Sequence, residues 1–188
     1  GQIRADEFLP ELRGRRAIRK YREMRDNDST IGAVMYAIEQ ILRDVPLDVK
    51  RANDTPQAIA EKDYLVSVLN DMDHSLEDHV AEAISYFSYG FGWFEVVYKR
   101  RVGPNERSPK KNSKGTDGRL GIRKIASRAP WTINRFDVDR VTGDVLGIDQ
   151  DTGFSGGKNY IPISKSMYYH TTSLNGDPSG RSILRNAY

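Results

Sequence analysis

The chain has no cysteine among its 188 residues. Without thiols it can form neither a disulfide framework nor a thiolate metal site, and it has no cysteine nucleophile. Its longest apolar runs fall well short of the roughly 20 residues that a membrane-spanning helix needs, and the first ten residues lack the apolar centre of a signal peptide. The sequence therefore excludes disulfide-rich scaffolds and predicts no membrane partner.

Charge is distributed unevenly along the chain. The net charge is +3, but residues 12–25 hold seven Arg and Lys against one acid, and residues 99–128 hold eleven against two. These zones carry +6 and +9, so the remainder carries 3 minus 15, or −12. Two basic zones on an acidic body can attract polyanions or meet acidic surfaces of neighbouring subunits.

The first quarter of the chain predicts two helices. Residues 1–27 are Arg-rich with few apolar positions, which indicates a basic N-terminal arm with a weakly anchored helix near residues 10–24. A cap at Asp28 or Ser29 begins a second helix that runs to about Arg43, because apolar residues recur there at three- and four-residue spacing.

Residues 45–49 alternate apolar and polar side chains, which favours a short strand. Thr55 followed by Pro56 begins the next helix, since Pro is well suited to the first helical position. Ser75 begins another helix, which two glycines, at 90 and 92, should end.

The second half of the chain is β-rich. Aromatic and β-branched residues favour strands over five ranges, which are 93–100, 120–126, 131–138, 145–149 and 167–172. Residues 103–118 contain no large apolar residue, which predicts a long, solvated, flexible loop. The fold class is therefore α+β, with N-terminal amphipathic helices followed by a mostly antiparallel sheet in one domain over residues 28–188.

Three histidines are candidates for chemistry. His74 and His79 are five residues apart, so on a helix their rings do not share a face, and surface or capping roles suit them better than metal binding. His170 lies in the last predicted strand without the GxSxG context that a serine hydrolase needs. A packed or hydrogen-bonded histidine is the better interpretation there.

Two further patterns could bind ions. Residues 176–181 (GDPSGR) precede a helical segment and could cradle a phosphate, but GxxxxGK[ST] is absent, so we interpret them as a turn in which Gly180 permits close approach and Ser179 caps the helix. Asp137, Asp139 and Asp149 could share one face of a sheet and faintly suggest a divalent metal. Exposed acids in hairpins are more common than metal sites, so we expect no metal here. We also identify no catalytic residue and expect no cofactor.

Seven basic residues are the candidates for contact with DNA or with another subunit: Arg13, Arg15, Arg16, Arg19, Lys110, Lys111 and Lys114. The lysines lie in a loop without interleaved aromatic residues, so stacking on single strands is unsupported. Contact with a phosphate backbone, without sequence readout, is the most that these residue types predict.

The order of segments along the chain resembles the portal proteins of tailed bacteriophages, most closely the branch in Mu-like phages. The segments that carry the resemblance are 17–24 (AIRKYREM), 31–34, 45–49 (VPLDV), 89–95 (YGFGWFE), 128–133 (RAPWTI), Phe136, 147–150 (GIDQ), 161–162 and 178–185 (PSGRSILR). Each motif alone is weak, and their shared order over residues 17–188 carries the resemblance.

The resemblance implies a structural subunit of a homo-oligomeric ring, usually of twelve copies, at one capsid vertex of the virion. It implies a conduit for double-stranded DNA during packaging and ejection, and contacts with the major capsid protein, terminase and neck or adaptor proteins. Assembly would take place in the host cytoplasm. The resemblance also implies that the chain is the first portion of the wing, with the stem, clip and crown beyond Tyr188. Independently, the sequence stops in a predicted helix without a cap, so we expect it to be a piece of a longer protein.

Two alternatives remain open from the residues themselves. The chain could be a stand-alone, sequence-independent DNA-binding module, which a steep salt dependence of duplex binding would reveal. It could also be an enzyme with an unrecognised site near His170 and the Asp-rich hairpin.

Overall fold

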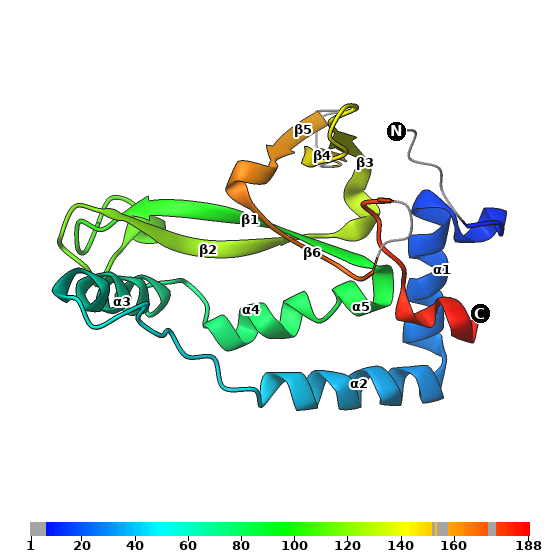
Figure 1. Cartoon of the computed structure of the whole chain (residues 1–188), viewed down its shortest axis with the longest axis horizontal. Coiled ribbons are helices and arrows are strands. Elements are labelled where there is room, and N and C mark those ends of the chain that lie inside the picture. The colour runs from blue at the N-terminus through cyan, green and yellow to red at the C-terminus, as the bar shows by residue number, and fades with distance from the viewer. Residues whose placement is uncertain (1–6, 152, 154–157, 173–175) are drawn as a thin grey trace.

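The computed structural model describes residues 7–151, 153, 158–172 and 176–188. It is elongated, with a long β-hairpin running along its length above a row of helices (Figure 1). N-terminal helices followed by two three-stranded antiparallel sheets confirm the predicted α+β class. Residues 1–6 of the predicted arm lie outside the described residues.

The helices of the described residues are α1 (Gly14–Asn27), α2 (Ser29–Arg43), α3 (Pro56–Leu69), α4 (Leu76–Ala83) and α5 (Tyr86–Tyr89). Three of these five helices, α2, α3 and α4, begin at the side-chain caps that the sequence predicts. The Asp28 carboxylate accepts hydrogen bonds from the first N–H groups of α2, and the Thr55 hydroxyl does the same for α3. Ser75 and Asp78 form a reciprocal capping box at α4.

Three local predictions are wrong. Residues 45–49 form no strand but an exposed linker between α2 and α3, because no strand lies beside them to complete a ladder. The helix that Ser75 begins is not continuous but breaks after Ala83; its predicted end at Gly90 is confirmed as the end of α5, where a φ of 90° favours glycine. At the C-terminus a 3-10 helix, Ile183–Ala187, takes its cap from Ser182 rather than Ser179.

The first sheet has the order β2-β1-β6, with β1 (Phe91–Arg100) between β2 (Leu120–Arg128) and β6 (Ser166–His170). Trp93 and Phe94 are adjacent on β1 and are 0% and 1% exposed. Because successive side chains of a strand point to opposite faces, both faces of this sheet are covered. The ring of Phe94 packs against His79 of α4, and that of Trp93 against Phe136 of the second sheet.

The second sheet has the order β3-β4-β5, formed by β3 (Ile133–Val138), β4 (Val145–Asp151) and β5 (Lys158–Pro162). The hairpin between β3 and β4 turns at residues 139–144, with Gly143 at a φ of 83°, which favours glycine. β5 was not predicted. It follows a glycine-rich stretch in the sequence, and its pairing with β4 is what defines it as a strand.

The helix α1 is anchored firmly in the core, so the prediction of weak anchoring is wrong. Ala17, Ile18 and Tyr21 are each 7% exposed or less and belong to the cluster that contains Trp93 and Ile148. Few apolar residues are enough here because all of them lie on one side of the helix. The further division into an arm at 1–27 and a domain at 28–188 stays a prediction.

Candidate interaction surfaces

The candidate contact residues of the two basic zones lie at opposite ends of the molecule (Figure 1). The candidate arginines lie at the start of α1, and the candidate lysines lie in the loop between β1 and β2, beside α3 at the far end of the hairpin. The rest of the second zone follows β1 and β2 back along the hairpin. The sequence predicted two basic zones but could not say that the fold separates them. A single polyanion contact would therefore engage one end only, or would have to follow the length of the molecule.

The arginines at the start of α1 are held by neutral partners. Arg15 donates hydrogen bonds to the backbone carbonyl of Trp131 at 2.9 Å and to the Asn134 side chain at 3.2 Å. Arg13 donates to the backbone carbonyl of Glu7. These bonds order the side chains without neutralising them, which leaves positive charge free to meet an anionic partner.

Three further arginines of α1, Arg16, Arg19 and Arg22, differ in their surroundings. Arg16 and Arg19 are exposed and make no hydrogen bond or ion pair within the part of the chain that the structure describes. Arg22 lies over the Trp131 ring at 4.7 Å and also pairs with Asp26 at 3.5 Å. The structure thus adds two residues, Arg22 and Trp131, to the predicted set, and only tertiary folding brings Trp131 to this helix.

The loop 103–118 is not the purely solvated segment that its composition predicts. Gly103 and Ser113 are buried, and the Ser113 hydroxyl donates a 2.5 Å hydrogen bond to the Asp71 carboxylate. The backbone N–H of Lys114 donates to the same carboxylate at 2.7 Å, and its ammonium donates to the Asn70 carbonyl. The loop is therefore fastened to the end of α3.

Of the three lysines that the sequence proposes for contact with DNA or another subunit, only two have no described side-chain partner. Lys110 and Lys111 lie in a short 3-10 helix, Pro109–Lys111, and are exposed. Since Lys114 is engaged in fastening the loop, the lysine pair is the part that can meet a phosphate backbone or a neighbouring protein.

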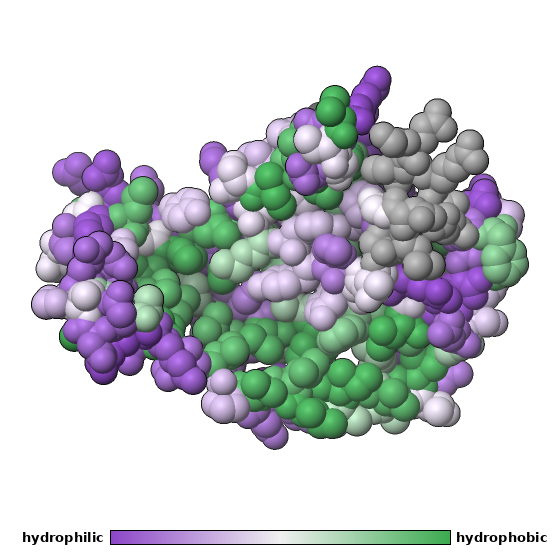
Figure 2. Space-filling model, in the orientation of Figure 1, coloured by the Kyte–Doolittle hydropathy of each residue, from purple (hydrophilic) through white to green (hydrophobic). Residues whose placement is uncertain are grey.

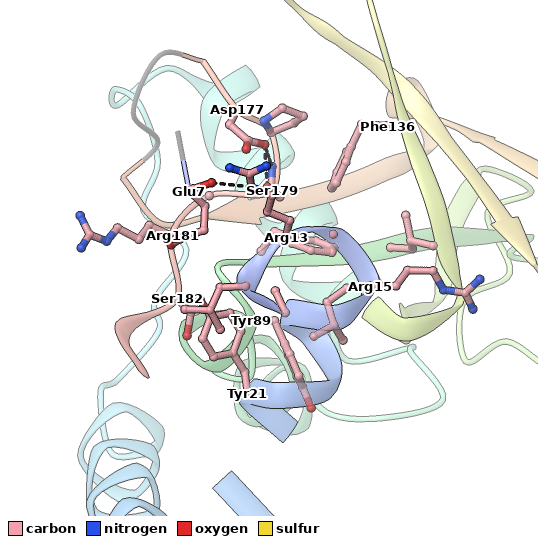
Figure 3. Close-up of a pocket in the computed structure, with 18 of the residues that line it drawn as sticks. Glu7, Arg13, Arg15, Tyr21, Tyr89, Phe136, Asp177, Ser179, Arg181 and Ser182 are labelled. Atoms are coloured by element: carbon pink, nitrogen blue, oxygen red, sulfur yellow. Dashed lines mark hydrogen bonds between the residues drawn. The ribbon is translucent and has the colours of Figure 1, made fainter. Parts of the chain in front are cut away.

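A pocket of about 600 Å³ opens beside the start of α1, between β3 and residues 177–185 (Figure 3). Tyr21, Tyr89 and Phe136 line its apolar side. The pocket is also lined by Glu7 and Arg185. These two residues form a bidentate ion pair that joins the N-terminal segment to the C-terminal 3-10 helix. The lining thus carries both signs of charge and favours no single class of ligand.

The turn at residues 176–181 is architectural. The carboxylate of Asp177 accepts hydrogen bonds from the backbone N–H and the hydroxyl of Ser179, so an acid occupies the place that a phosphate would need. Gly180 lies against the carbonyl of Gly90, where a β-carbon would overlap that oxygen. The prediction of close approach is confirmed, and it explains how this turn closes onto the end of α5.

His79 and His170 contact other residues of the fold in different ways. His79 is 3% exposed, which contradicts the predicted surface role, and its ring nitrogen lies 3.1 Å from the Tyr169 hydroxyl. Burial, with a smaller contribution from His74, lowers the pKa of His79 below its ordinary value. His170 is exposed and stacks on Tyr168, with a hydrogen bond to the Thr171 carbonyl, in agreement with the prediction of a paired side chain.

The hairpin carboxylates are engaged separately. Asp149 pairs with Arg135 at 2.6 Å, Asp137 accepts a hydrogen bond from Tyr160, and Asp139 caps the turn between β3 and β4. Within the described ranges, no three His, Asp or Glu side chains form a group that could hold a metal ion. The carboxylates therefore serve cross-strand pairing and turn formation here.

An apolar surface on α2 was not predicted (Figure 2). The periodicity indicated one core stripe, and Met35 is indeed 7% exposed, but Val34 and Ile41 are 54% and 68% exposed. A signal was present in the sequence: residues 29–38 contain no charged side chain, although 29% of the chain is charged. No helix of the described residues is long and apolar enough to cross a membrane.

A family model described as the portal protein of Mu bacteriophage matches residues 18–188. The match includes the larger part of α1 and every later element of the structure. No curated protein matches the chain significantly.

Proposed function

The chain belongs to the family of Mu bacteriophage portal proteins, and from this premise we propose that it is a subunit of a closed ring at one vertex of the capsid and that its residues form the first portion of the wing domain. The observation that carries the proposal is the match over residues 18–188, which spans both sheets and the helices between the two basic zones. Portal proteins are structural components of the virion rather than enzymes.

In this proposal the ring, of twelve copies, conducts double-stranded DNA during packaging and ejection. It docks the terminase and the neck or adaptor proteins, and it contacts the major capsid protein, after assembly in the host cytoplasm. Exposed apolar and basic surfaces on one subunit support a protein that associates with itself, because a closed ring needs two different surfaces that fit each other.

Contact with DNA in such a ring has to be independent of sequence, since any genome segment must pass. Lys110 and Lys111 suit this role because an ammonium group contacts phosphates without reading bases. Their loop is fastened through Asp71, so the lysines are presented from a defined position at the end of the hairpin.

Electron microscopy of the purified protein tests the proposal. We expect ring-shaped particles with one central opening, and mass photometry should give a single oligomer mass that is a multiple of the subunit mass. Monomers at every concentration examined would contradict the proposal. Duplex DNA should not be needed for the rings to form.

A second candidate, a stand-alone DNA-binding module, is favoured by the exposed arginines of α1 that have no acidic partner. It predicts micromolar binding of duplex DNA by the monomer, with a logarithmic salt slope of about 0.9 for each neutralised phosphate. A flat salt response, or no binding at low salt, would dismiss it.

A further inference from the structure

The apolar surface on α2 continues into the linker after the helix. Val34, Ala37 and Ile41 follow one another at three- and four-residue spacing, so they form one stripe along α2. Val45 and Leu47, which are 51% and 56% exposed, extend the stripe beyond the end of the helix. We call these five residues the α2 apolar face (Figure 2).

This face lies beside the side of α2 that already packs against the protein. Ile31, Met35 and Ile38 turn toward α1 and the core cluster, which leaves the α2 apolar face as additional apolar surface. A helix that is apolar well beyond its packed side is typically buried in an assembly. Exposed patches of this kind usually mark interaction sites.

The α2 apolar face has an acidic border. Residues 39–48 contain three acids and one base, and the base, Arg43, already lies 3.6 Å from Glu39. Asp44 and Asp48 are exposed, and their side chains make no hydrogen bond or ion pair with any described residue. A partner that covers this face should therefore carry positive charge beside apolar surface.

The same chain presents a surface with that composition on α1. Arg15, Arg19 and Arg22 occupy one stripe of the helix, and Trp131, which is 42% exposed, lies beside it. Arginine stems and an indole ring supply apolar area, while the guanidinium groups supply the charge. We call these four residues the Arg/Trp face.

We propose that the α2 apolar face of one subunit packs against the Arg/Trp face of the next copy in the ring. The two faces share no residue, which is what a head-to-tail interface requires, and closure of such an interface gives a ring. Asp44 and Asp48 would then lie near Arg15 and Arg19 of the neighbour. This inference rests on the proposed ring and names the contact that builds it.

A symmetric pairing of two α2 apolar faces fits the charges less well. It would bring two sets of Asp44 and Asp48 together without a cation between them, and like charges in an interface are unfavourable. It would also give a closed dimer instead of a ring.

Cysteine cross-linking tests the contact cleanly because the chain has no cysteine of its own. The double variant Ile41→Cys with Arg19→Cys, treated with a short bis-maleimide, should give a ladder of dimers, trimers and larger species. Each single variant should give none. A matched control pairs Arg19→Cys with Val141→Cys, since Val141 is 90% exposed in the turn between β3 and β4.

The outcomes separate the two proposals. Rings in the microscope without the ladder would overturn this interface and leave the ring intact. A cross-linked dimer from Ile41→Cys alone would show the symmetric pairing and would also overturn it. The absence of rings and ladder together would overturn the proposed function and this interface with it.

Charge reversal gives a second measurement on the assembled protein. Arg19→Glu and Asp48→Arg should each raise the concentration for half-assembly by about tenfold or more, since each places like charges together. The two changes combined should recover most of that loss. Arg107→Glu, an exposed change in the loop 103–118, should stay within about twofold. Equal effects of single and combined changes would contradict the contact.

Discussion

The carboxylate of Asp71 and the ammonium of Lys99 form a buried ion pair, with Nζ and Oδ1 3.3 Å apart and both side chains 3% exposed. Asp71 follows α3 and Lys99 lies on β1, so the pair joins the helical layer to the sheet. Ser113 and Lys114 complete the hydrogen bonding of the carboxylate, and Lys99 also donates to the Asn112 carbonyl. One fully bonded buried pair thus fastens the basic loop.

We predict that Asp71→Asn lowers the free energy of unfolding by about 3 kcal/mol, because it leaves the Lys99 ammonium buried without its counterion. Urea denaturation followed by far-UV circular dichroism measures the change. The matched control is Asp73→Asn, whose 44% exposed carboxylate lies 3.9 Å from Arg123 and should matter by less than about 1 kcal/mol. Equal urea midpoints for the two variants would contradict the role given to Asp71.

The same pair predicts a response to acid. Burial by itself raises the pKa of Asp71, but hydrogen bonds from Lys114, Ser113 and Lys99 hold it below its ordinary value. A carboxyl with a lowered folded pKa stabilises the protein above its unfolded pKa and loses that contribution as pH falls through the folded value. Unfolding free energies measured from pH 6 down to pH 3 should therefore fall, and should fall less in Asp71→Asn.

His79 makes the stability of the protein depend on pH in a different range, near neutrality. Its pKa is lowered by burial, so the unfolded chain takes up a proton more readily, and stability should decline as pH falls below about 6.5. We expect His79→Phe to flatten this decline between pH 7 and pH 5, as seen in urea midpoints. His170→Phe changes an exposed ring and should leave the decline unchanged. A wild-type midpoint that is constant over this range would contradict the prediction.

The contact between Gly180 and Gly90 predicts a sharp glycine effect. Gly180→Ala combines a φ of 59° with overlap of the Gly90 carbonyl, whereas Gly176→Ala meets a similar φ of 75° but no atom of the described residues within 4 Å. Both variants carry the backbone strain, so their difference isolates the overlap. We expect Gly180→Ala to be less stable than Gly176→Ala by about 2 kcal/mol in thermal or urea unfolding. Equal losses would show that the turn moves away freely.

The lysine pair at the end of the hairpin predicts a change in salt dependence. Lys110→Ala with Lys111→Ala should reduce the logarithmic salt slope of duplex binding by about 2, since each lysine releases about 0.9 counterions on contact with a phosphate. Fluorescence anisotropy at several salt concentrations measures the slope. Lys50→Ala with Lys165→Ala removes two other exposed lysines and should leave it unchanged. A slope that responds equally to both pairs would mean that the loop has no particular role.

The sequence by itself determined the features that depend on neighbouring residues. The caps at Asp28, Thr55 and Ser75, the glycine at the β3–β4 turn and the aromatic strand β1 all follow from local chemistry, and each is present. The order of motifs along the chain also identified the family, because members of a protein family share sequence similarity. The distribution of charge along the sequence identified the two basic zones but not their positions in the folded molecule.

Only the tertiary structure decided which of these local features are buried, paired or free. The residues 45–49 alternate like a strand yet stay an exposed linker, while the fragment at β5 becomes a strand because β4 lies beside it. Asp71 and Lys99 are 28 residues apart, and only the packing of α3 against the hairpin turns two ordinary charges into a buried pair. Likewise, the apolar stripe of α2 is divided between core and surface by the position of α1, since burial depends on partners that lie far away in sequence.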